Sequence, residues 1–63
     1  MNKFILIDMG NKGKLCVCTE SIVSICNVDE NGMLNESGCI VETLSGSYES
    51  IETPEEIYKR INL

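Results

Sequence analysis

The chain has 63 residues, of which 43% are hydrophobic and 24% charged, and its formal net charge is −5. This composition is that of a folded chain and excludes wholesale disorder, while the length limits the chain to one domain, residues 1–63, that buries only about 60% of its unfolded surface. We expect a free energy of unfolding of only a few kcal/mol, or about 0.05 to 0.15 kcal/mol per residue.

The charges are unevenly distributed along the sequence. Lys3, Lys12, Lys14, Lys59 and Arg60 lie toward the two ends, and residues 15–58 contain nine acidic residues and no Lys or Arg. Binding to phosphates or to an anionic membrane surface needs Lys and Arg, so we expect neither nucleic acid nor membrane as a partner. The acidity indicates a solvated face that keeps the protein soluble, with an acidic docking surface as the alternative.

The longest apolar run near the start, residues 4–7, is too short for a signal peptide or a membrane span. We therefore expect a cytoplasmic protein. Disulfides are uncommon in that reducing compartment, so its four cysteines should be free thiols.

Five short segments rich in β-branched and aromatic residues predict strands over 3–8, 15–19, 22–28, 39–44 and 47–51. Turn signals separate them: the Gly/Asn/Lys cluster at 10–13 and Ser45-Gly46. The polar segment 29–38 contains Asn31-Gly32 and predicts a long hairpin loop. We expect an antiparallel meander of five strands that forms a small barrel or a strongly twisted sheet.

The end of the sequence predicts a helix over about residues 54–62. Thr53 is a suitable N-cap, Pro54 suits the first helical position, and Glu56 stands where it would close a capping box. A helix this short is unstable alone in water and must pack against the sheet. Its predicted docking face consists of Ile57, Ile61 and Tyr58. The expected fold class is mostly β (α+β) with one C-terminal helix.

The cysteines raise the question of a chemical site. Alternate residues of a strand share a face, so Cys16 and Cys18 should point to one side and their neighbours Leu15, Val17 and Thr19 to the other. Because Cys packs as a small hydrophobe, we favour buried filling without chemistry. The alternatives are a redox pair, a disulfide and a zinc site. A C-x-C pair lacks the helix-start C-x-x-C spacing of reactive thiols, and the spacing of the four cysteines, with no His present, does not match the usual zinc motifs. The zinc ligands would be Cys16, Cys18, Cys26 and Cys39.

Catalytic motifs are lacking: the sequence has no His, no Gly-rich phosphate loop and no nucleophile with a neighbouring base. Glu55 and Glu56 are explained by the helix start. The segment 29–32 resembles a cation-binding loop only loosely, so a plain turn is favoured. We therefore expect a protein that is not an enzyme and has no cofactor.

Several positions are candidates for contact with another protein. Met33 and Leu34 are the large apolar residues of the polar loop 29–38, and they either form a contact point or fold back onto the domain. Glu42 and Glu49 are the acidic residues of the last two predicted strands. An unprotected sheet edge would also permit strand addition by a partner or formation of a homo-oligomer.

The order of features also supports a family resemblance. The features that carry it are Gly13, Cys18-Thr19 where the family usually has Ile-Asn, Ile22, Ile25, Ile40, Gly46, Ile51 and the closing T-x-E-E-I-x-x-x-I at 53–61. With these the chain resembles the small FlbD/SwrD-type proteins of bacterial flagellar and swarming operons, and similar short β-domain proteins of bacteria and their mobile elements. The resemblance implies a non-enzymatic cytoplasmic accessory protein, tied to motor output in flagellated species.

Together these observations predict a small interaction or regulatory module that contacts a protein partner of unknown identity through a sheet edge and an acidic surface. The alternatives are an acidic inhibitor from a mobile element that imitates nucleic acid, and a zinc-stabilised structural domain.

Overall fold

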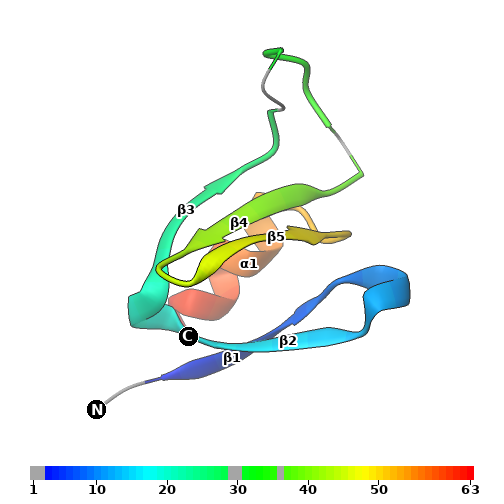
Figure 1. Ribbon diagram of the computed structural model, residues 1–63. Helices are drawn as coiled ribbons and strands as arrows, with labels where there is room; N and C mark the ends of the chain where they lie inside the picture. The colour runs from blue at the N-terminus through cyan, green and yellow to red at the C-terminus, as the bar shows by residue number, and fades with distance from the viewer. Residues whose placement is uncertain (1–2, 29–30, 36) are drawn as a thin grey trace.

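The computed structural model describes residues 3–28, 31–35 and 37–63 and shows a mostly β chain that ends in a helix (Figure 1). The strands are β1 (Phe4–Asp8), β2 (Lys14–Cys18), β3 (Ile22–Cys26), β4 (Cys39–Thr43) and β5 (Gly46–Ser50). Two 3-10 turns, η1 (Gly10–Lys12) and η2 (Thr19–Ser21), lie on either side of β2, and the helix α1 spans Pro54–Ile61. The predicted strands and helix are confirmed, with ends that differ by one or two residues.

The strands form two antiparallel sheets, β1–β2 and β3–β4–β5, and not one continuous meander (Figure 1). The turn η2 separates them, and Ser21 Oγ holds it by donating to the Cys18 carbonyl at 2.8 Å. Beyond η2 the chain pairs with a new neighbour, since Ile22 lies opposite Thr43 of β4. The expectation of one meander curling into a barrel is therefore corrected: no closed barrel forms among the described residues.

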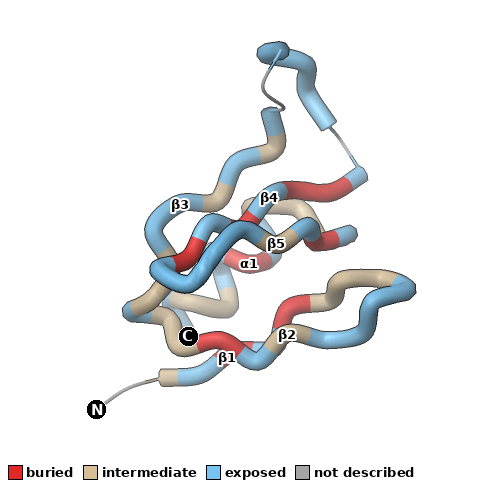
Figure 2. Tube along the Cα trace, in the orientation of Figure 1, coloured by how far each residue is buried: buried red, intermediate tan, exposed pale blue. Residues whose placement is uncertain are grey.

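The core lies between the two sheets and α1. Its buried apolar residues are Ile5, Ile7, Val17, Cys39, Val41 and Ile57. Figure 2 shows them in red, together with two buried polar residues and a buried glycine. Burial alternates along β1 and β4, which is the pattern of strands covered on one face. Ile57 is fully buried and Ile61 packs against the core, as predicted for the docking face, but Tyr58 is exposed. The side chain of Tyr58 therefore lies on the exposed side of α1.

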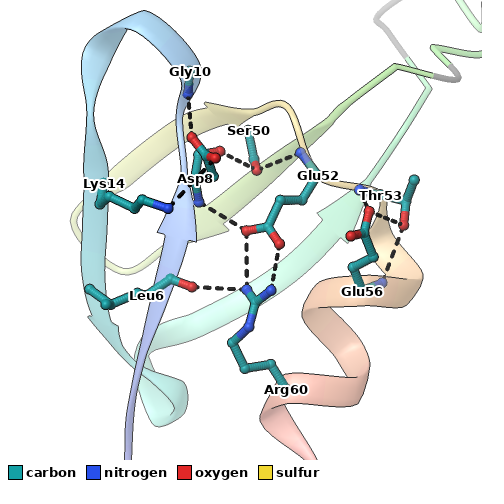
Figure 3. Close-up of polar contacts among 9 residues, drawn as sticks. All are labelled: Leu6, Asp8, Gly10, Lys14, Ser50, Glu52, Thr53, Glu56 and Arg60. Atoms are coloured by element: carbon teal, nitrogen blue, oxygen red, sulfur yellow. Dashed lines mark hydrogen bonds and ion pairs between the residues drawn. The ribbon is translucent and has the colours of Figure 1, made fainter.

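The predicted capping box begins α1 (Figure 3). The Glu56 N–H donates to Thr53 Oγ1 at 3.2 Å, and the Thr53 N–H donates to Glu56 Oε1 at 3.0 Å. These bonds satisfy backbone donors that a helix start leaves unpaired. Within the described part of the chain, no helix has the length and apolar content needed to cross a membrane.

Candidate functional site

The four cysteines do not share one environment, and all of them are free thiols. The buried filling predicted for Cys16 and Cys18 is wrong for Cys16, which is exposed, while Cys18 is half-buried. Cys26 is exposed, whereas Cys39 is buried in the core, and burial, reinforced by the Glu52 carboxylate, raises the pKa of its thiol. No three His, Cys, Asp or Glu side chains gather as ligands for a metal ion in the described ranges. The geometry therefore gives no support to a zinc site.

The register of the first hairpin explains why Cys16 faces outward. Ile5 lies opposite Val17 and Ile7 lies opposite Leu15, so these four residues share the inner face. This arrangement buries larger apolar side chains than the alternative with both thiols inside, and the free energy of burial grows with apolar area. The sequence pattern identified two faces correctly, but the thiols occupy the outer one.

The outer edge of β1 is closed by polar groups that arrive from the end of the chain (Figure 3). Hydrogen bonds from Thr19 N–H to Lys3 C=O and from Met9 N–H to Gly13 C=O mark the hydrogen-bonded pairs of the hairpin. Because such pairs alternate with non-bonded ones, the backbone groups of Leu6 and Asp8 point away from β2. Of these outward groups, residues 50–60 pair with the Leu6 carbonyl and with both backbone groups of Asp8.

An ion pair between Glu52 and Arg60 supplies much of this closure. Arg60 donates through both terminal nitrogens to the Glu52 carboxylate, with Nη1 to Oε2 at 3.1 Å, and Nη1 also donates to the Leu6 carbonyl at 2.8 Å. Glu52 Oε2 accepts the Asp8 N–H at 2.9 Å. The Asp8 carbonyl accepts from Ser50 Oγ at 2.7 Å and from Ile51 N–H at 3.1 Å. Hydrogen bonds from Arg60 lower the pKa of Glu52 and keep its carboxylate ionised.

The edge strand β3 lies beside a groove and has no comparable closure in the described structure. The groove has a volume of about 650 Å³ and is lined by residues 22–25 of β3 and by Pro54, Glu55, Tyr58 and Lys59 of α1. A register shift between Ile22 and Ser24 leaves Val23 as a bulge residue. Val23 is 60% exposed and Tyr58 is 66% exposed, so the groove presents apolar side chains from both elements. We call this surface the β3–α1 groove.

The predicted contact residues lie elsewhere on the molecule. Met33 and Leu34 are exposed in the segment that joins β3 to β4, where Leu34 forms an isolated bridge with Val28, so they do not fold back onto the core. Glu42 and Glu49 are exposed on β4 and β5, and Glu42 accepts a hydrogen bond from Ser24 Oγ at 3.3 Å. Residues 29 and 30 of the loosely cation-like segment 29–32 lie outside the described residues.

The sequence did not reveal the β3–α1 groove because its lining residues come from two segments, 22–25 and 54–59, that lie far apart in the chain. One local signal was available. Ile22 and Val23 are adjacent apolar residues in a strand, so their side chains cannot both lie on the covered face without a distortion. Tyr58 gave no such signal. It follows Ile57 in the helix, and the sequence does not show whether the face that packs on the sheet extends from Ile57 to include Tyr58.

No family model, curated protein or solved structure matches this chain. What the chain does must therefore be inferred from its own geometry.

Proposed function

We propose that the chain is a non-catalytic interaction module that receives an extended segment of a partner protein along β3, with side chains of that segment in the β3–α1 groove. The observation that carries this proposal is the contrast between the strand edges. The outer edge of β1 is closed by Glu52 and Arg60, whereas β3 combines an open edge with an apolar groove. An open edge offers backbone hydrogen bonds, and a neighbouring groove selects side chains.

The charges around β3 favour a partner segment that is apolar and basic. Glu42 belongs to β4 and accepts a hydrogen bond from Ser24 of β3 on the outer face of the sheet. Glu55 belongs to α1 and lines the groove. Lys59 is the one cation among the residues that line the groove. A segment with Lys or Arg between apolar side chains would therefore meet carboxylates on both sides of the strand.

The resemblance to small accessory proteins is compatible with this role, since such a module needs no catalytic residues. We propose further that it acts in the cytoplasm as an accessory or regulatory subunit of a larger assembly.

Site-specific photo-crosslinking in the cell that makes the protein tests the proposal. A photoreactive side chain at position 23 should capture one defined protein, because Val23 is 60% exposed at the groove. The same group at Leu44, which is 80% exposed at the β4–β5 turn, is the matched control and should not capture it. A synthetic peptide from the captured segment should then bind the purified chain, and Val23→Lys should weaken that binding about tenfold or more.

Two outcomes would contradict this function. Equal capture from positions 23 and 44 would show that the groove is not selective. Binding that survives Val23→Lys but falls steeply between low and moderate salt would favour the acidic inhibitor that imitates nucleic acid, because its contacts would be mainly charge pairs.

A further inference from the structure

Two charges of opposite sign line the helical side of the β3–α1 groove, Glu55 and Lys59. They stand four residues apart on α1, a spacing at which a glutamate and a lysine can pair across one helical turn. Both are exposed, and neither side chain forms an ion pair or a hydrogen bond with any residue that the structure describes. Both groups are thus accessible to a ligand in the groove.

The end of α1 lies beside the beginning of β3. Lys3 links them, because its Nζ donates to the Ile61 carbonyl at 2.9 Å and its own carbonyl accepts from the Thr19 N–H at 2.8 Å. Thr19 begins the turn η2, and β3 follows directly after this turn. Lys59, in the second half of the helix, therefore lies toward the Ile22 end of the groove.

The beginning of α1 lies toward the opposite end of β3, so the helix and the strand run in opposite directions (Figure 1). The connection passes through the sheet, since Ser50 at the end of β5 lies opposite Cys39, and the next residue of β4 lies opposite Cys26. The helix starts shortly after Ser50, at Pro54. Glu55 therefore lies toward the Cys26 end, and the helical side of the groove is negative at that end and positive at the other.

The spacing of the two charges matches an extended peptide. Four residues of a helix rise about 6 Å, and two residues of a strand rise about 6.6 Å. Alternate residues of a strand also point to the same side. A segment added to the edge of β3 would therefore direct two side chains, two positions apart, at Glu55 and Lys59.

We propose that Glu55 and Lys59 select the charge pattern and the direction of the segment that binds along β3, an inference that rests on the function proposed above. Antiparallel pairing is the commoner and more stable arrangement of strands. A segment antiparallel to β3 runs in the same direction as α1 and meets Glu55 before Lys59. The preferred segment therefore carries a Lys or Arg followed two positions later by an Asp or Glu. The exposed Val23 and Tyr58 favour apolar side chains at its other positions.

Selection from a library of random peptides displayed on phage tests this pattern with the full chain as bait. Peptides that bind the wild type but not Val23→Lys should be enriched in a basic residue followed two positions later by an acidic one. Glu55→Gln should abolish the preference for the basic residue alone, and Lys59→Gln the preference for the acidic residue alone. Because each variant keeps one preference, the selection also reports that it is folded. Each change should weaken one enriched synthetic peptide about two- to fivefold, as expected for loss of an exposed ion pair.

The matched control is Glu49→Gln, since Glu49 is exposed on β5 and is not among the residues that line the groove; it should keep both preferences. The exchange Glu55→Lys/Lys59→Glu should reverse the order, with the acidic residue first.

Three results overturn the inference and leave the proposed function intact: peptides that depend on Val23 but show no charge pattern, an acidic residue first in peptides that bind the wild type, or an unchanged order in the exchanged variant. Failure to recover any peptide that depends on Val23 would count against the function itself, and the inference would fall with it.

Discussion

Removal of the Glu52 carboxylate should destabilise the domain more than removal of any other exposed or half-exposed acid considered above. Glu52→Ala deletes two bonds with Arg60 and leaves the Asp8 N–H at the β1 edge without its acceptor. Hydrogen bonds to charged groups contribute about 1.5 to 3 kcal/mol each and are not additive. The side chains of Arg60 and Glu52 are 33% and 13% exposed, so solvent weakens the pair. We expect a net loss of about 2 kcal/mol, which lowers Tm by roughly 8 to 16 °C in a domain of this size.

Thermal unfolding followed by circular dichroism measures this change. Glu55→Ala is the matched control, because Glu55 is exposed in the first turn of α1 and loses mainly its interaction with the helix dipole. Its cost should be at most about 0.3 to 1 kcal/mol. Equal shifts in Tm for the two variants would refute the idea that Glu52 closes the β1 edge.

The effect of Glu52 should also depend on pH in a defined direction. Hydrogen bonds from Arg60 lower the folded-state pKa of Glu52, so its contribution is complete above the ordinary glutamate pKa of about 4.3 and is lost as the pH falls through the lowered value. The difference in Tm between wild type and Glu52→Ala should therefore be constant near neutral pH and shrink on acidification.

Three further outcomes follow from the structure. Gly38→Ala should reduce the free energy of unfolding by more than about 2 kcal/mol in urea titration, because its Cβ would clash with the Ser50 carbonyl oxygen, which is backbone and cannot move aside cheaply; wild-type stability would contradict this contact. Ile57→Ala should cost about 2 to 5 kcal/mol in the same assay, since Ile57 is fully buried, and a loss below 1 kcal/mol would show that α1 is not packed on the core. In a thiol-modification time course, exposed Cys16 should react at once and Cys39 at the rate of unfolding, because Cys39 is buried and its pKa is raised; simultaneous reaction would contradict that burial.

Local signals in the sequence were sufficient for the elements of the fold. The helix start at Thr53 and Pro54 and the strand segments rest on interactions within a few residues, and the structure confirms them. The division into two sheets could not be predicted in this way, because it depends on whether β3 pairs with β2 or only with β4. Both pairings are compatible with the same alternating pattern.

The candidate sites were harder to predict than the fold. Two alternating faces were identified for residues 15–19, but the choice between them depends on Ile5 and Ile7, which lie across the hairpin. The closure of the β1 edge joins Asp8 to Glu52 and Leu6 to Arg60, and no periodicity in the sequence links positions that far apart. Pairing of this kind becomes visible only when the tertiary structure is known.

The closure of β1 has a consequence for the order in which the protein can fold during synthesis. The groups that complete the edge come from positions 42, 44 and 54 residues later in the chain. The first hairpin therefore leaves the ribosome with an unsatisfied edge and an uncovered core face, and it stays so until Arg60 has been synthesised as well. Contacts between distant parts of a chain form slowly, so the nascent chain carries an exposed strand edge until residues 50–60 reach it. Stopping translation before Arg60 would leave the Leu6 carbonyl at this edge without its donor.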